Sequence, residues 1–119
     1  MIIELALALL AQDWRVIDGD TVQIGEERIR LIDIDTPELR GADCDAERLL
    51  GQRAAERLAA LLQGRDIVIE RTGTDVYGRT LARLRVDGRD AGALLVAEGY
   101  AVEWSGRRHD WCAGQRRTQ

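Results

Sequence analysis

The stretch WRVIDGDTVQIGEERIRLIDIDTPE, residues 14–38, predicts a meander of three β-strands. Apolar and polar residues alternate along WRVI, TVQI and RIRLIDI, which is the pattern of strands that bury one face. Turns are expected at Gly19 and over Gly25–Glu27, where glycine interrupts this alternation. The domain is therefore expected to begin with β structure.

The segment after this meander has the periodicity of a helix. Leucine and alanine recur at three- and four-residue spacing over Asp45–Leu62, with charged residues on the opposite face. Asp45 is expected to be the N-cap, and Gly64 follows the end of the helix. The apolar face would consist of Leu50, Ala54, Leu58 and Leu61 or Leu62.

The remaining segments complete a small β-rich domain. Strands are expected at 67–70 and 81–86, and Asp90 is expected to cap a short helix that Gly99 ends. The predicted fold class is α+β, mainly β. It is a five-stranded antiparallel barrel with one helix between strands 3 and 4 and a second helix after strand 5, and closure of the barrel removes unpaired strand edges.

Length and composition indicate one domain over residues 1–119. The chain is 45% hydrophobic and 32% charged, and no apolar run approaches the roughly 20 residues of a membrane helix. The net charge of −4 means that any binding of a polyanion must be local. Residues 1–11 are expected to be a signal remnant or an extra N-terminal element. Residues 105–119 lack periodicity and are expected to form a loosely held tail.

The chain has two cysteines and one histidine, His109, and contains no CxxC motif, which argues against a zinc site. Cys44 and Cys112 are far apart in sequence. Spacing alone leaves two alternatives open, a long-range disulfide or two unpaired thiols.

Two acidic clusters flank the meander, Asp18 with Asp20 and Asp33 with Asp35 and Glu38. Antiparallel connectivity can bring the end of the third strand close to the start of the second. Carboxylates that converge repel one another unless a cation lies between them, and oxygen ligands favour Ca²⁺ or Mg²⁺. The alternative is ordinary turn chemistry at each strand end.

Arg30 and Arg79 are the cationic candidates. Arg30 lies in a strand otherwise given to the core, so its guanidinium needs an anionic partner such as Asp35 or Glu38. Two arginines beside a divalent cation would instead bind a phosphodiester, with Glu38 free to activate or orient water. Because Arg30 and Asp35 are five residues apart, one shared site requires the strand to bend between them.

The motifs VIDGDT (16–21), RIRLIDIDTPE (28–38) and TDVYGRT (74–80), in this order, resemble the staphylococcal nuclease (thermonuclease) family. The resemblance covers about residues 12–104 and implies an OB-fold barrel and a calcium-dependent nuclease. The implied substrates are DNA, with single strands preferred, and RNA, with low sequence specificity. The implied Ca²⁺ ligands are Asp20, Asp35 and the main-chain carbonyl of Thr36. The implied catalytic residues are Arg30, Glu38 and Arg79, and substrate would be bound by Arg30, Arg79 and Tyr77.

The chain also departs from the family pattern. Val76 replaces a lysine of some members, and Asp33 adds a charge whose role the sequence leaves open. Some bacterial relatives carry a cysteine pair, which favours a disulfide and an exported protein over a cytoplasmic one. Core or tail packing is the favoured role for Tyr100, Trp104 and Trp111, with base stacking as the alternative. We expect a monomer, and the alternative function is a non-catalytic OB-type module that binds nucleic acid or protein.

Overall fold

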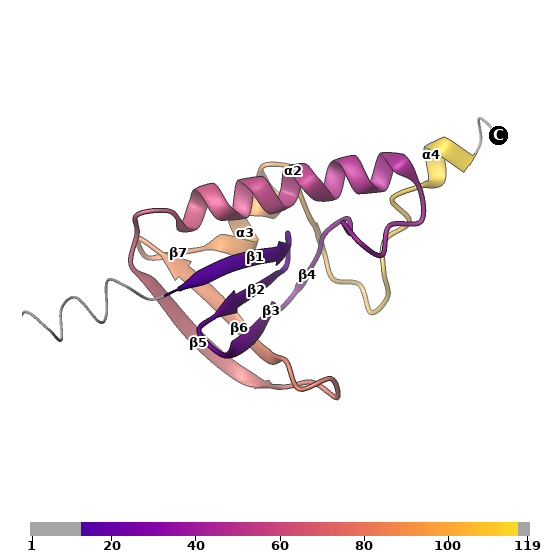
Figure 1. Ribbon diagram of the computed structural model, residues 1–119. Coiled ribbons are helices and arrows are strands. Elements are labelled where there is room, and N and C mark those ends of the chain that lie inside the picture. Colours follow the sequence, from indigo (N-terminus) through magenta and orange to yellow (C-terminus); the bar gives the residue numbers. More distant parts are fainter. Residues whose placement is uncertain (1–12, 117–119) are drawn as a thin grey trace, which may run out of the picture.

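A computed structural model describes residues 13–116, so the expectation for residues 1–11 lies outside the described residues. None of the helices in this part of the chain is both long and apolar enough to cross a membrane. The elements in chain order (Figure 1) are β1 (Trp14–Asp18), β2 (Thr21–Ile24), β3 (Glu27–Leu31), β4 (Ile34–Asp35), α2 (Asp45–Leu62), β5 (Ile67–Thr74), β6 (Thr80–Val86), β7 (Arg89–Asp90), α3 (Ala91–Ala97), β8 (Val102–Glu103) and α4 (Ala113–Arg116).

The strands form a mixed sheet. Its order is β1-β2-β3-β6-β5, with β7 paired to β6, and β4 pairs with β8 in a second sheet. Neighbours β1–β2, β2–β3 and β5–β6 are antiparallel, but β3 and β6 are parallel. A parallel pair needs a long crossover, which α2 and β5 provide. The predicted all-antiparallel barrel is therefore wrong, and within residues 13–116 the strand order is open, with β1 and β5 at its ends.

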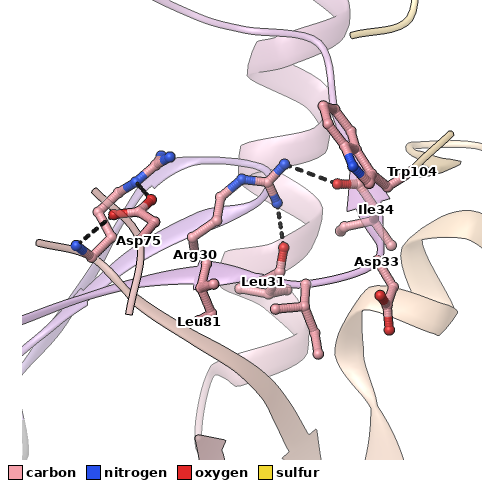
Figure 2. Close-up of a pocket in the computed structure, with 9 residues that line it drawn as sticks. Arg30, Leu31, Asp33, Ile34, Asp75, Leu81 and Trp104 are labelled. Carbon is pink, nitrogen blue, oxygen red and sulfur yellow. Dashed lines mark hydrogen bonds and ion pairs between the residues drawn. The ribbon is translucent and has the colours of Figure 1, made fainter. Parts of the chain in front are cut away.

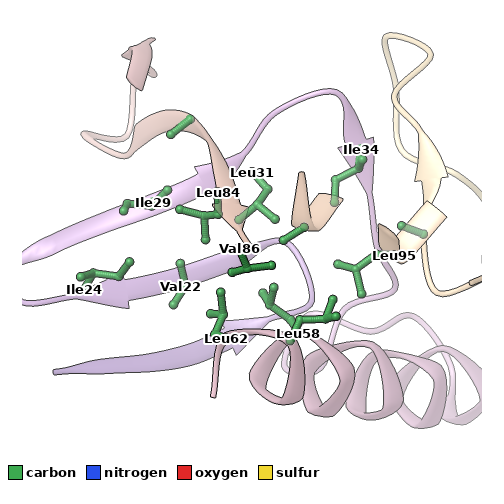
Figure 3. Close-up of a cluster of buried hydrophobic side chains, with 14 residues drawn as sticks. Val22, Ile24, Ile29, Leu31, Ile34, Leu58, Leu62, Leu84, Val86 and Leu95 are labelled. Atoms are coloured by element: carbon green, nitrogen blue, oxygen red, sulfur yellow. The ribbon is translucent and has the colours of Figure 1, made fainter. Parts of the chain in front are cut away.

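Helix α2 lies across the sheet and covers the core. Its predicted bounds are confirmed, and Figure 3 shows Leu58 and Leu62 facing Val22 and Val86 of the sheet. The predicted apolar face is wrong at Leu50, which is 38% exposed. The buried positions of the first turns are taken by Glu47 and Gly51 instead. This end of the helix therefore packs against polar backbone rather than against the apolar core.

The caps of the two main helices differ from each other in chemistry. The N-cap of α2 is Cys44, whose Sγ accepts a hydrogen bond from the Glu47 N–H at 3.3 Å, so the expectation for Asp45 is wrong. Cys44 is held by a disulfide to Cys112, 68 residues further along the chain. The predicted N-cap of α3 is confirmed, because Oδ1 of Asp90 accepts from the first turn of that helix.

The chain bends between β3 and β4, as a site shared by Arg30 and Asp35 requires. Asp33 adopts a left-handed backbone conformation, with φ 68°. Its carbonyl accepts the N–H of Trp104 at 2.9 Å, and the N–H of Ile32 donates to the carbonyl of Ala82 at 3.1 Å. The strand therefore leaves the first sheet at Ile32 and continues as β4 in the second.

Glu27 connects three strands through its carboxylate. Arg71 of β5 donates two hydrogen bonds to it, at 2.6 and 2.8 Å, and the Thr80 hydroxyl of β6 donates a third at 2.6 Å. The hydrogen bonds from Arg71 and then from Thr80 lower the pKa of Glu27 to about 2. Because the folded-state pKa is depressed, this stabilisation is complete above the unfolded pKa and is lost as the pH falls towards 2.

We expect Glu27→Gln to lower the free energy of unfolding at pH 7 by about 0.5–1 kcal/mol, since the pair is partly exposed to solvent. The difference from the wild type should shrink as the pH falls from 5 towards 2. Urea unfolding at a series of pH values measures both. Glu70→Gln, which removes the exposed pair of Glu70 with Arg85 on the same hairpin, is the control. If both variants lost the same unfolding free energy with the same pH dependence, Glu27 would contribute no more than an ordinary surface ion pair, and its proposed role in connecting three strands would be contradicted.

Candidate functional site

The two acidic clusters converge, as strand connectivity predicts. Asp20 lies in the turn after β1, and Asp35 ends β4. The N–H of Thr36 donates to Oδ2 of Asp20 at 3.3 Å, which places the second cluster directly against the first. Asp20 is 8% exposed and Asp35 4%. Two nearly buried carboxylates therefore occupy one region of the molecule.

A glycine is needed at position 19, between Asp18 and Asp20, because the backbone there packs closely against its neighbours and not because the turn requires a positive φ. Its φ is not positive, but a Cβ atom at this position would lie 2.7 Å from Cβ of Ala54 in α2 and 3.1 Å from Cβ of Thr36. Gly51 of α2 makes a similar approach to the other side of the site. A Cβ atom there would lie 2.5 Å from the carbonyl oxygen of Glu38. Helix α2 is thus the platform on which the acidic segments rest.

Arg30 links these carboxylates to the strand break. Its Nη2 lies 3.4 Å from Oδ2 of Asp20 and donates to the carbonyl of Ile34 at 2.9 Å. Its Nη1 donates to the carbonyl of Leu31, and Figure 2 shows both hydrogen bonds to the main chain. The anionic partner of Arg30 is therefore Asp20, and the expected pairing with Asp35 or Glu38 is wrong.

Arg79 is held by the turn that carries it. Its Nε donates to Oδ2 of Asp75 at 2.8 Å, while Oδ1 of Asp75 accepts the N–H groups of Arg79 and Tyr77. Tyr77 is 80% exposed, and the guanidinium carbon of Arg79 lies 5.5 Å from its ring centroid. Asp75 was not predicted as a site residue, although an aspartate that starts a glycine-containing turn is a recognisable signal.

Arg30 and Arg79 share one pocket of about 360 Å³. Figure 2 shows this pocket, with Arg30 lying between Asp75 and Trp104. Trp104 is 45% exposed, and Asp20, Asp35 and Glu38 are not among the lining residues. The pocket is lined by Arg30, Leu31, Ile32, Asp33, Ile34, Asp75, Arg79, Leu81 and Trp104.

The carboxylate of Asp33 pairs with a cation of the sheet other than Arg30. It forms an ion pair with Arg83 of β6 and is two-thirds exposed at its side chain. Its charge is therefore balanced at the surface.

Glu38 is half-exposed beside the buried carboxylates. Burial raises its pKa, as do the charges of Asp18, Glu47 and Asp20, while Arg108 opposes this shift. Arg108 Nε lies 3.8 Å from Oε1 of Glu38. A carboxyl with a raised pKa is a better proton acceptor than an ordinary glutamate.

Glu47 is a buried carboxylate that the sequence did not single out. It is 1% exposed and accepts the N–H groups of Glu38 and Asp43, each at 3.0 Å, and Nη2 of Arg108 at 2.5 Å. Burial alone would raise its pKa, but these hydrogen bonds lower it. Its position three residues after the N-cap Cys44 is the spacing of a capping box, which is the signal that could have identified it.

Residues 106–112, here called the strap, reach the same carboxylates. The His109 N–H donates to Oδ2 of Asp35 at 2.8 Å, and Nε1 of Trp111 donates to the same oxygen at 3.3 Å. Cys112 is joined to Cys44. The expectation of a loosely held tail is wrong for this part of residues 105–119. Of the two alternatives for the cysteines, a disulfide or two unpaired thiols, the structure has the disulfide.

The donors around Asp20 and Asp35 fit a hard cation. Within residues 13–116, no group of three or more His, Cys, Asp or Glu side chains is placed to hold a metal ion. Asp35 has no ion-pair partner in the same range, although its charge is nearly buried. The hydroxyl of Thr36 is buried and has no hydrogen-bond partner among the described residues. Nearly buried oxygen donors of this kind suit Ca²⁺ better than zinc.

Comparison with known proteins identifies relatives of this chain. The family model described as "Staphylococcal nuclease homologue" matches residues 28–116. Protein ParB of Escherichia coli is 35% identical over 108 residues, 80% of this chain and 56% of that protein. Micrococcal nuclease of Shigella flexneri is 34% identical over 100 residues, 73% and 53% of the two chains. Thermonuclease of Staphylococcus intermedius is 36% identical over 93 residues, 73% and 55%. The chain spans about half the length of these curated relatives.

We expect Gly51→Ala to destabilise the protein by about 1–3 kcal/mol, because the new methyl group overlaps main-chain atoms that have little freedom to move. Urea unfolding monitored by circular dichroism measures the change. Gly114→Ala in α4 is the matched control, since a Cβ atom there meets nothing within 4 Å. Equal stability of Gly51→Ala and Gly114→Ala would show that α2 does not press on the segment that carries Glu38.

Proposed function

Because this chain belongs to the staphylococcal nuclease family, we propose that it is a calcium-dependent nuclease. In this proposal it hydrolyses phosphodiester bonds of DNA, single strands preferred, and of RNA, with low sequence specificity. The OB-like fold that the family implies carries the site. The observation that carries the proposal is that Arg30 lines a pocket with Arg79 and also contacts the metal-side carboxylate of Asp20.

The two arginines are suited to hold the phosphate. A guanidinium presents paired N–H donors that match phosphate oxygens, and it stays charged at all physiological pH values. Arg79 is held by Asp75 through Nε, and this hydrogen bond does not use the two terminal nitrogens of the guanidinium. In the proposal Arg30 and Arg79 bind the non-bridging oxygens and stabilise the charge that grows on them during attack.

The carboxylates are proposed to bind the metal ion and to accept a proton. In the proposal Asp20, Asp35 and the main-chain carbonyl of Thr36 hold Ca²⁺. When bound, Ca²⁺ supplies Lewis-acid stabilisation of the phosphate charge. Glu38 accepts the proton of the attacking water, a role supported by its partial exposure and by the direction of its pKa shift.

The surroundings of the pocket support a single-stranded substrate. Trp104 and Tyr77 are exposed aromatic side chains at or beside the two arginines. Unpaired bases can stack on such rings, whereas the bases of a duplex are already stacked. We further propose that the protein is exported and monomeric. The Cys44–Cys112 disulfide supports export, since disulfides persist in oxidising compartments.

Labelled single-stranded DNA should be hydrolysed with Ca²⁺ and remain intact with chelator. We expect Arg79→Ala and Glu38→Gln each to lower kcat/KM by about 100- to 1,000-fold, as removal of a group that acts in the transition state does. Arg57→Ala, which removes an exposed pair with Glu98, is the control and should keep full activity.

Three outcomes separate the functions. Equal hydrolysis in chelator would exclude the calcium-dependent mechanism. Binding of the oligonucleotide without hydrolysis, with or without Ca²⁺, would identify a binding module instead. Hydrolysis of duplex and single-stranded DNA at equal rates would contradict the proposed preference only.

A further inference from the structure

The strap is a candidate for a role in the proposed mechanism, because it contacts two of the three carboxylates of that mechanism, Asp35 and Glu38. Figure 1 shows the segment between β8 and α4 running past the segment that joins β4 to α2. The strap contacts Asp35 at the end of β4, Glu38 and Asp43 in the joining segment, and Glu47 in the first turn of α2. The strap lies outside both sheets and outside α2 and α3.

The contacts with Asp35 fix the orientation of its carboxylate. Both donors, the His109 N–H and Nε1 of Trp111, bind the same oxygen, Oδ2. No described residue donates to Oδ1. Hydrogen bonds to one oxygen of a carboxylate prevent its rotation and leave the other oxygen to act as a ligand in a defined direction.

The contacts of Arg108 act on Glu38 in two ways. Its guanidinium lies 3.8 Å from the Glu38 carboxylate, where the attraction between opposite charges favours one orientation of that side chain. It also binds Glu47, whose carboxylate accepts the Glu38 main-chain N–H. Arg108 thus contacts the side chain of Glu38 directly and its main-chain N–H indirectly, through Glu47.

The disulfide fixes the strap where these contacts form. Cys112 follows Trp111 directly and is 1% exposed, and its partner Cys44 is the N-cap of α2. Sγ of Cys112 lies 3.7 Å from Oε1 of Glu47. The end of the strap is therefore bound covalently to the helix that also supports Glu38 through Gly51.

We propose that the strap is a positioning element of the active site, in which Trp111 and the His109 main chain orient Asp35, and Arg108 orients Glu38. The disulfide between Cys44 and Cys112 holds the strap in this position. The inference rests on the proposed nuclease function and deepens it. A strap that merely obstructed the site would have the opposite effect, because loosening it would raise activity.

Trp111→Phe tests the contact with Asp35, since it keeps an aromatic ring and removes the Nε1 donor. Loss of a group that orients a metal ligand typically weakens metal binding 10- to 100-fold, and we expect about tenfold here. Isothermal titration calorimetry with Ca²⁺ alone measures this without reference to activity. Trp14→Phe on β1 is the matched control and should keep the wild-type affinity.

Arg108→Gln tests the contact with Glu38. We expect kcat for single-stranded DNA to fall about tenfold, with KM within about twofold of the wild type, because Arg108 contacts Glu38 and not the arginines proposed to bind the phosphate. Arg57→Gln is the matched control. Reduction of the folded wild type with a phosphine reductant should weaken Ca²⁺ binding in the same direction as Trp111→Phe, and circular dichroism verifies that the protein stays folded.

The outcomes distinguish the two proposals. If the wild type neither binds Ca²⁺ nor cleaves DNA, the proposed function fails and the inference fails with it. If the wild type does both, but Trp111→Phe and Arg108→Gln behave like their controls, only the inference fails. Higher activity in either variant or after reduction overturns it in favour of an obstructing strap. Should one variant fail to fold, the other two measurements still decide.

Discussion

The geometry of the acidic region depends on one buried carboxylate, that of Glu47. A charge that is 1% exposed is costly unless hydrogen bonds replace its water. The replacements come from three parts of the chain: the Glu38 N–H, the Asp43 N–H and Arg108. Because all three donors are needed to offset one desolvation cost, none of these segments can move away independently. The helix start, the loop before it and the strap are therefore coupled through a polar contact rather than through the apolar core.

Local patterns were sufficient to predict the meander and the two main helices, but not the short elements β4, β7, β8 and α4 or how the strands associate. The meander, the bounds of α2 and the Asp90 cap follow from alternation, helical spacing and capping chemistry, which involve only neighbouring residues. The parallel pairing of β3 with β6 does not, since it depends on how a crossover of more than forty residues closes. The prediction that Leu50 is buried was wrong for a related reason. The first turns of α2 face a polar loop, so Glu47 and Gly51 rather than a leucine occupy the inward positions.

The sequence was sufficient to predict which residues come together at the site, but not which hydrogen-bond and ion-pair partners each of them has. The convergence of the clusters at Asp20 and Asp35 and a bend after Arg30 were expected from connectivity and register, and the structure has both. The predicted partner of Arg30 was wrong because the sequence offers several carboxylates near the ends of neighbouring strands, and spacing along the chain does not rank them. The strap was missed because its contacts with Asp35 are made by a main-chain N–H and an indole, groups whose role depends on placement rather than on residue type.

Asp33 shows how a residue can serve a site without belonging to it. Asparagine and aspartate tolerate the left-handed backbone region better than other residues with a side chain, so Asp33 can take φ 68° at a moderate cost. That conformation ends β3 and turns the chain, and it brings the carbonyl of Ile34 within hydrogen-bonding distance of Arg30. A residue restricted to the extended region would continue the strand and carry Ile34 away from that guanidinium. The charge of Asp33 is balanced by Arg83, so its contribution to the site is the direction of the main chain.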